Sequence, residues 1–173
     1  MPELDKEDGT TEVVSASDSN IYKGTTTLTD ITPASYTVGD GRYAYATLNN
    51  KLYLFRQDAK PVVYNGTTAT AIEDDSDYSG TVPQADVVVS AFGRLWVANT
   101  STDTTTIYWS DLLTGVKWDT GSAGSIDVSK VWADGSDTIV ALYAHNGFLI
   151  IFGKRQILIY KGAEDPATMS LAD

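Results

Sequence analysis

The sequence predicts an all-β fold made of repeated antiparallel units, each with three or four short strands. Two observations lead to this prediction. The apolar residues are mostly Val, Ile, Tyr, Trp and Leu, and Thr is abundant, a mixture that favours pleated sheet over helix. Short apolar runs also recur along the chain, joined in pairs by turns that contain Asn or Gly. The chain therefore reads as a series of hairpins.

The hairpins repeat with a common pattern. In the last copy, "AHNGFLIIFGKRQILIYKG", the turn Asn146-Gly147 is followed by the run "FLIIF". Equivalent turns, Asn49-Asn50-Lys51 and Phe92-Gly93-Arg94, are followed by "LYLF" and "LWVA". Asn-Asn, Gly-Arg and Asn-Gly suit two-residue hairpin turns because Asn and Gly tolerate positive φ. An aromatic-centred strand comes next in each unit, and we expect a fourth copy of it, with no hairpin in front, at Tyr22; the four strands are centred on Tyr22, Tyr64, Tyr108 and Tyr160.

The spacing of the units predicts their architecture. A repeat of about 40–50 residues with four strands is typical of a β-propeller blade. The first strand of each unit is almost continuously apolar, as expected for burial on both faces, and the last is polar and Thr-rich, as expected at an outer edge. A plain antiparallel sandwich also alternates strands with turns and remains the alternative.

We expect an acidic N-terminal segment over residues 1–19 and propeller-type repeats over residues 20–173. The repeats divide into a part blade at 20–31, blades at 43–73 and 87–128, and a part blade at 138–173. Closed propellers have about 4 to 8 blades, so the chain should form an incomplete propeller whose end faces are covered by other chains or by further sequence. Eight side chains should be mostly buried: Val89, Leu95, Val97, Ile107, Leu142, Leu149, Ile151 and Ile157.

Composition excludes several classes of function. The formal net charge of −11 argues against a groove that holds nucleic acid by neutralising phosphates. The chain has no Cys, which excludes disulfides, thiolate metal sites and thiol nucleophiles. No run approaches the roughly 18 apolar residues of a membrane helix, and the N-terminal residues lack the basic and apolar regions of a signal peptide.

The sequence also gives little support to catalysis. His145 is the single histidine and lies beside a hairpin turn, where turn propensity explains its neighbours. The nucleophile-elbow motif G-x-S-x-G does not occur, and the acidic residues are scattered in loops without a distinctive pair. We therefore expect no catalytic residues and no cofactor.

Loop residues are the candidates for partner contacts. The run "EDDSDYSG" offers oxygen ligands for Ca²⁺, but it lacks the full calcium-loop pattern, so a solvated acidic loop is expected and no metal site. Trp96 and Trp109 fall on repeat strands and should pack in the core, whereas Trp118 and Trp132 lie nearer loops. The hairpin "GKR" is basic and could pair with an acidic partner. The candidate contact residues are therefore Asp74, Asp75, Asp77, Tyr78, Trp118, Trp132, Lys154 and Arg155.

Two segments, "FGRLWVANTSTDTTTIYWSDLLTGVKW" and "NGFLIIFGKRQILIYKGAEDPATMSL", resemble the propeller region of virion proteins from tailed bacteriophages. These proteins include the tail nozzle proteins of short-tailed phages (tail tubular protein B) and related DNA-stabilisation and tail-hub proteins. The matching motifs are a Gly-Arg-Leu-aromatic strand, an Ile-Tyr-Trp-Ser-Asp strand and an "L-I-I-F-G-K-x-x-I" hairpin ending in Tyr-x-Gly. They stand here at residues 93–96, 107–111, 149–154 with Ile157, and 160–162. The resemblance is good over residues 85–171, loose over 40–75 and absent over 1–20.

The resemblance implies a non-enzymatic structural role in the tail nozzle, hub or connector of a phage virion, where the protein would brace the DNA exit channel. Its partners would be other tail or connector proteins and further copies of itself in a ring or assembly, formed in the host cytoplasm. The acidity is consistent with this role, because a conduit has to let DNA slide without binding it. No sequence-specific nucleic-acid binding and no membrane segment are expected. The alternative is a glycan- or receptor-binding propeller module that uses loop aromatics.

Overall fold

The computed structural model describes the whole chain except residues 1, 7, 18, 40 and 173. In the described residues, sixteen strands form four antiparallel sheets of four strands each, and the helical structure is one short 3-10 turn, η1 (Ile72–Asp74). The prediction of an all-β chain is confirmed.

In chain order, sheet I contains β1 (Glu3–Asp5), β2 (Thr11–Ala16), β3 (Ile21–Lys23) and β4 (Thr29–Asp30); sheet II contains β5 (Ala44–Leu48), β6 (Lys51–Arg56), β7 (Ala59–Tyr64) and β8 (Ala69–Ala71). Sheet III contains β9 (Ala85–Ala91), β10 (Arg94–Thr100), β11 (Thr106–Trp109) and β12 (Gly124–Asp127); sheet IV contains β13 (Ile139–His145), β14 (Phe148–Gly153), β15 (Ile157–Lys161) and β16 (Ser170–Leu171).

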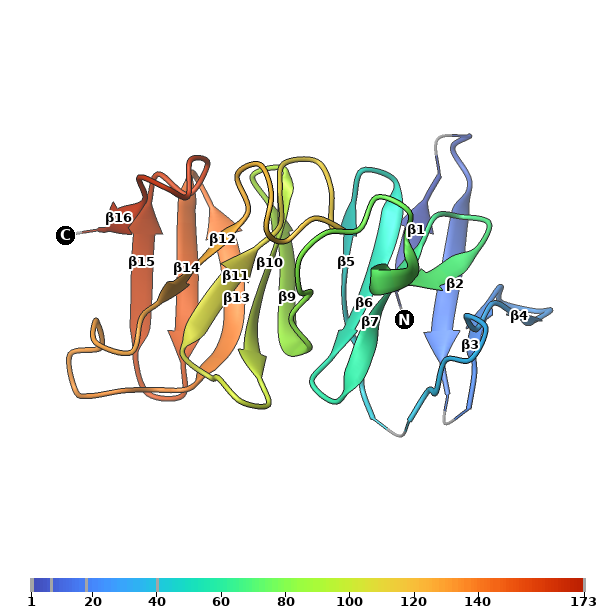
Figure 1. Ribbon diagram of the computed structural model, residues 1–173, viewed down its shortest axis with the longest axis horizontal. Helices are drawn as coiled ribbons and strands as arrows, with labels where there is room; N and C mark the ends of the chain where they lie inside the picture. Colours follow the sequence, from blue (N-terminus) through green and yellow to red (C-terminus); the bar gives the residue numbers. More distant parts are fainter. Residues whose placement is uncertain (1, 7, 18, 40, 173) are drawn as a thin grey trace.

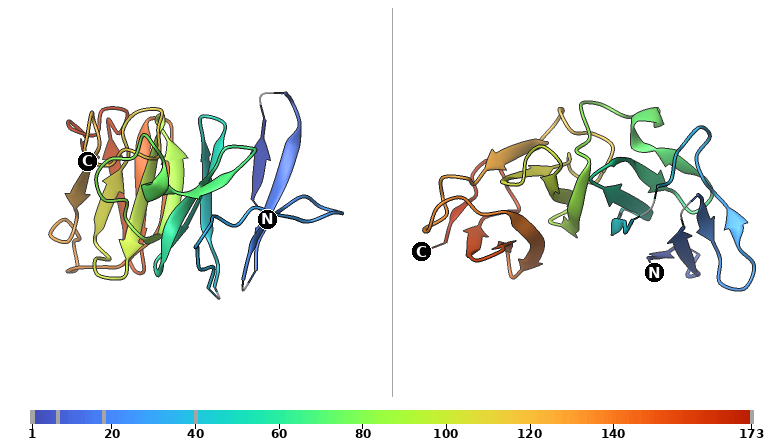
Figure 2. Two further views of the ribbon diagram at one scale, coloured as in Figure 1. Left: turned by 45° about the vertical axis from the view of Figure 1, so that its right-hand side comes forward. Right: turned by 90° about the horizontal axis from the view of Figure 1, so that it is seen from below.

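Each sheet is a simple meander in which strands that follow one another in sequence are hydrogen-bonded neighbours. The sheets also follow one another in space in chain order, from sheet I on the right of Figure 1 to sheet IV on the left. The first strands of sheets II, III and IV lie beside one another, β5 against β9 and β9 against β13. Figure 2 shows that the stack curves into an open arc with sheets I and IV at its two ends.

Two-residue turns fix the hairpins that begin sheets II, III and IV. Both residues of each turn have positive φ, with values of 50° and 57° for Asn49-Asn50, 52° and 71° for Phe92-Gly93, and 47° and 79° for Asn146-Gly147. This is the backbone of the type I′ turn, whose twist matches that of the strands. The expectation of a Gly-Arg turn is wrong by one residue, because Arg94 already belongs to β10, where its side chain is buried.

Hydrophobic clusters fill the three junctions between consecutive sheets. Sheets II and III bury both of their faces, because alternate residues of one strand enter different clusters. In β6, Leu52 and Leu54 pack toward sheet I, whereas Tyr53 and Phe55 pack toward sheet III. All four of these side chains are at most 1% exposed. This double burial is the physical reason that these strands are continuously apolar in sequence.

The structure corrects the expected limits of the two end units. The strand at Tyr22 was expected to have no hairpin before it, but β2 and β1 precede it and complete sheet I. Residues 3–5 and 11–16, expected to lie in a segment outside the repeats, therefore supply two strands to a four-stranded sheet. Sheet IV likewise has four strands, although its last strand, β16, has only two residues.

Six of the eight side chains predicted to be buried are exposed by 8% or less: Leu95, Val97, Ile107, Leu142, Leu149 and Ile151. Val89 is half-buried at the margin of the cluster between sheets III and IV. The prediction for Ile157 is wrong, because its side chain is 58% exposed. Ile157 points away from sheet III, on the face of sheet IV that no other described part of the chain covers.

Candidate interaction surface

The acidic loop after η1 and the loop that contains Trp118 lie side by side. Ser79 forms a bridge with Lys117, the Ser79 amide donates to the Val116 carbonyl at 3.2 Å, and the Trp118 amide donates to the Ser79 carbonyl at 3.0 Å. The structure therefore places the loop of Asp74, Asp75, Asp77 and Tyr78 next to the loop of Trp118, and Tyr78 packs against the cluster that contains Trp118. Asp75 stabilises its own loop, because its Oδ1 accepts a hydrogen bond from the Asp77 amide at 2.9 Å and its carbonyl accepts one from the Tyr78 amide at 3.0 Å.

The two tryptophans expected at partner contacts are buried instead. Trp118 is 8% exposed, packs edge-on against Phe55 at a ring separation of 6.3 Å, and donates its indole N–H to the Gly115 carbonyl. Trp132 is 5% exposed and belongs to the cluster between sheets III and IV. Their loops fold back over the junctions between sheets, so position in a loop did not predict exposure. Neither ring offers a flat surface to a sugar or a partner.

The basic hairpin between β14 and β15 is anchored to the loop that precedes β13. The buried carboxylate of Asp137 accepts the Arg155 amide and the Thr138 amide, each at 2.8 Å, and its Oδ1 lies 4.0 Å from the Arg155 Nε. Burial opposes ionisation of Asp137, but these backbone hydrogen bonds and the Arg155 charge lower its pKa below the ordinary value. The Lys154 amide also donates to the Thr138 carbonyl, at 3.1 Å. The side chains of Lys154 and Arg155 remain exposed.

Asp137 should therefore control the order of this hairpin. Asp137→Ala removes the acceptor for two amides and should accelerate hydrogen exchange at Thr138 and Arg155, while the exchange of β10 stays as it is. Asp137→Asn keeps one acceptor oxygen and should show a smaller effect. The measurement is hydrogen exchange by NMR, and unchanged exchange in both variants would show that the carboxylate does not anchor the hairpin.

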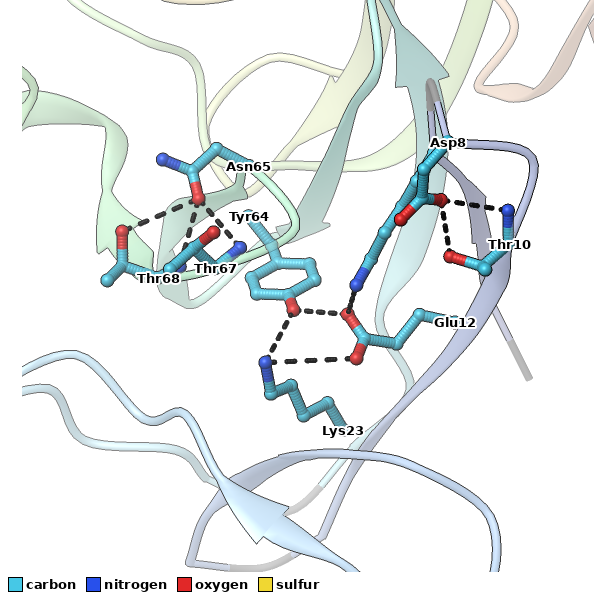
Figure 3. A network of polar contacts seen from close by, with 9 residues as sticks. Asp8, Thr10, Glu12, Lys23, Tyr64, Asn65, Thr67 and Thr68 are labelled. Carbon is cyan, nitrogen blue, oxygen red and sulfur yellow. Dashed lines mark hydrogen bonds and ion pairs between the residues drawn. The ribbon is translucent and has the colours of Figure 1, made fainter.

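A partly buried polar network joins sheet I to sheet II (Figure 3). The Tyr64 hydroxyl donates to the Glu12 carboxylate, Lys6 Nζ lies 3.0 Å from Glu12 Oε2, and Lys23 Nζ lies 3.7 Å from Glu12 Oε1. Lys23 Nζ also donates to the Tyr64 hydroxyl at 3.3 Å. Burial works against ionisation of Glu12, but the tyrosine hydrogen bond and the two lysines outweigh it and lower its pKa. Burial and the same hydrogen bond raise the pKa of Tyr64.

This network should make the docking of sheet I sensitive to acid. A carboxyl group whose pKa is lower in the folded than in the unfolded state stabilises the fold at pH values above its unfolded-state pKa, which is 4.5 for Glu12. That stability is lost as the pH falls through the folded pKa. Tyr64→Phe removes the hydroxyl and should lower the free energy of unfolding by about 1.5–3 kcal/mol at neutral pH, as for other hydrogen bonds to charged groups.

Urea unfolding at neutral pH and at a series of acidic pH values measures both effects. The acid-dependent loss should be smaller in Glu12→Gln, which cannot ionise at this position. If the free energy of unfolding fell equally steeply with decreasing pH in the wild type and in Glu12→Gln, the assignment of the acid sensitivity to Glu12 would be contradicted.

An open cleft lies on the concave side of the arc. It has a volume of about 600 Å³ and is lined by residues 41, 42, 44, 56–58 and 86 together with Val140. Most of its charged groups are already engaged: Asp86 accepts the Gln57 amide at 2.9 Å, and Arg56 pairs with Asp58 and donates to the Gly39 carbonyl. The Arg56 guanidinium also lies 5.2 Å from the centre of the Tyr43 ring. These contacts stabilise the walls of the cleft. Because the polar side chains bind one another, they do not form a set of groups directed at a common ligand.

The outer face of sheet IV, which is directed away from sheet III, exposes several large apolar side chains. We call it the C-terminal end face; it consists of Ala141, Tyr143, His145, Phe148, Ile150, Phe152, Ile157, Ile159 and Lys161, which the strand register places on one side. Tyr143 is 57% exposed, Phe148 37% and Ile159 41%. Contiguous apolar surface of this kind marks an interaction site on a soluble protein. Sequence reasoning missed it as a site, although the alternation of Ile157, Leu158, Ile159 and Tyr160 is apolar on both faces and was a signal for it.

Other kinds of site are not supported by the described residues. These residues contain no group of three or more His, Cys, Asp or Glu side chains that could hold a metal ion. His145 is exposed at the end of β13, beside the Asn146-Gly147 turn. Within the described part of the chain, no helix has the length and apolarity needed to cross a membrane.

Comparison with other proteins does not assign a family. No protein-family model matches the chain, and no curated protein sequence matches it.

Proposed function

We propose that this chain is a non-enzymatic structural component of a phage virion, in the tail nozzle, hub or connector region, and that its sheets are blades of an incomplete β-propeller. The sequence resemblance supports the virion context, and its motifs now have a physical meaning. The residues of these motifs that recur most clearly, Leu95, Trp96, Ile107 and Leu149, are completely buried between sheets. The motifs therefore describe the packing of one sheet on the next.

The arrangement of the sheets supports the propeller proposal. Each sheet is a four-stranded meander, as in a propeller blade, and the first strands of sheets II, III and IV lie side by side on the concave side of the arc. The last strand of each sheet is short, with two to four residues. Short outer strands limit the free sheet edge that could pair with other chains.

The observation that carries the proposed assembly role is the C-terminal end face. The two junctions on either side of sheet III bury large aromatic residues completely, yet the next face in the series is left open. A protein that works alone gains nothing from an exposed apolar sheet, whereas a component of a larger assembly buries it on association.

The acidity supports the proposed place along a DNA path. With a formal net charge of −11, the chain repels a duplex over about 8–10 Å at physiological salt. Gel shift with duplex DNA at about 50 mM salt, where contacts between basic groups and phosphates are strongest, tests this point. We expect no shift, and micromolar, salt-sensitive binding would contradict a wall that lets DNA pass.

The binding-module alternative now has less support, because Trp118 and Trp132 are buried and leave no loop platform for sugars. Screening of the purified chain against a panel of glycans should therefore give no saturable binding. A specific glycan ligand bound by an isolated monomer would overturn the structural role.

A further inference from the structure

The C-terminal end face occupies the same place in sheet IV that a covered face occupies in sheets II and III. Counting from the two-residue turns, Tyr53, Trp96 and Ile150 stand at equivalent positions in the second strands of the three sheets. Their partners on the third strands are Val63, Trp109 and Ile159. In sheets II and III these pairs are buried under the next sheet, and in sheet IV the pair is open. By this equivalence, a further sheet of the same kind would fit on the open face of sheet IV.

The direction of packing defines which face of that sheet is needed. At every junction between the described sheets, the face toward the C-terminus of one sheet packs on the face toward the N-terminus of the next. Among the faces directed toward the N-terminus, the one that no other described sheet covers belongs to sheet I. We call it the N-terminal end face; it contains Asp5, Thr11, Val13, Ser15, Tyr22 and Asp30, which point away from the buried Leu4, Val14 and Ile21.

The two end faces have complementary chemistry. Val13 and Tyr22 are half-buried and supply apolar area on the N-terminal end face, and Asp5 and Asp30 give it negative charge. The C-terminal end face carries Lys161 and His145 beside its apolar centre, and none of its described residues is acidic. A contact between two C-terminal end faces would lack this complementarity, because neither face carries an acidic residue.

We propose that the C-terminal end face binds the N-terminal end face of a second copy of this chain, in a head-to-tail contact that continues the stack of sheets. Head-to-tail contacts form rings when the rotation closes, and a second copy doubles the four sheets to the upper end of the propeller range of about 4 to 8 blades. This inference rests on the proposed assembly function and adds to it the two surfaces that meet.

Cysteine crosslinking of the full chain tests the contact, and the absence of natural Cys makes every crosslink interpretable. Two single variants, Tyr22→Cys and Ile159→Cys, are prepared separately, mixed, and treated with a short thiol-to-thiol crosslinker. The matched control for position is Thr25→Cys, on the exposed β3–β4 connection of the same sheet as Tyr22. Circular dichroism verifies that each variant folds as the wild type does.

Head-to-tail docking predicts that a mixed dimer of Tyr22→Cys and Ile159→Cys is the main product. Either variant alone, and the mixture of Thr25→Cys with Ile159→Cys, should give at least several-fold less crosslinking. Crosslinking of Ile159→Cys with itself as the main product would show that two C-terminal end faces meet, which overturns this inference but leaves the assembly function standing. A wild-type chain that stays monomeric at all concentrations, without crosslinks, would overturn both.

Discussion

Trp96→Ala should lower the free energy of unfolding by about 3–5 kcal/mol, the range for truncation of a large buried aromatic residue. Trp96 is 0% exposed and sits at the centre of the junction between sheets III and IV. Its ring lies 5.3 Å from that of Trp109 and 6.4 Å from that of Phe92, and its indole N–H donates to the Ala91 carbonyl at 3.0 Å. The substitution therefore creates a cavity, removes two aromatic contacts and leaves a carbonyl without its donor. Urea unfolding followed by circular dichroism measures the loss.

Tyr143→Ala is the control for this prediction. Tyr143 is also a large aromatic residue of the sheet III–IV half of the molecule, but it is 57% exposed on the C-terminal end face. Its truncation should change the stability of the isolated chain by about 0.5 kcal/mol or less. Losses of equal size in the two variants would contradict the assignment of Trp96 to the core and Tyr143 to an open face.

Phe55→Ala should be the second strongly destabilising substitution, with an expected loss of about 3–5 kcal/mol. Phe55 is 0% exposed and contacts Trp118 in the junction between sheets II and III. The chain contains its own comparison, because Phe152 stands at the equivalent position of β14, on the C-terminal end face. Phe152→Ala should cost the isolated chain much less, since no described sheet covers this residue.

The same pair of variants separates folding from association. Phe55→Ala should weaken folding in dilute solution, whereas Phe152→Ala should leave folding nearly intact and weaken self-association. Unfolding curves at low protein concentration, combined with light scattering at high concentration, measure both properties. A Phe152→Ala variant that unfolds as readily as Phe55→Ala would mean that the end face is a covered core in the single chain.

The repeated hairpins could be predicted from sequence because their signals are local. Two-residue turns with Asn or Gly, followed by strands of continuous apolar residues, locate β6, β10 and β14. The aromatic strands were less reliable guides. Tyr64 and Tyr160 lie opposite Leu52 and Leu149, the second residues after their turns, whereas Tyr108 lies opposite Val97. Sequence similarity placed Tyr108 two residues away from its structural equivalent, because strand register depends on pairing that a motif does not record.

The features that could not be predicted depend on contacts distant in sequence. Strands β1 and β2 are rich in charged and polar residues, and they were missed because the partly buried Glu12 is held in a network that includes Tyr64 of another sheet. Trp118 and Trp132 lie in loops, which usually predicts exposure, yet both loops fold back over junctions between sheets. Ile157 was expected in the core because it is apolar on a strand, but burial of an outer face requires a further sheet.

The measurement that tests the central claim most directly is the mass of the purified wild-type chain over a wide range of concentrations, by sedimentation velocity, with negative-stain images of the largest species. An assembly component with an open apolar end face should associate as its concentration rises, resist dissociation by salt because the contact is largely apolar, and give closed or stacked particles in the images. A monodisperse monomer with high thermal stability at every concentration would contradict the account.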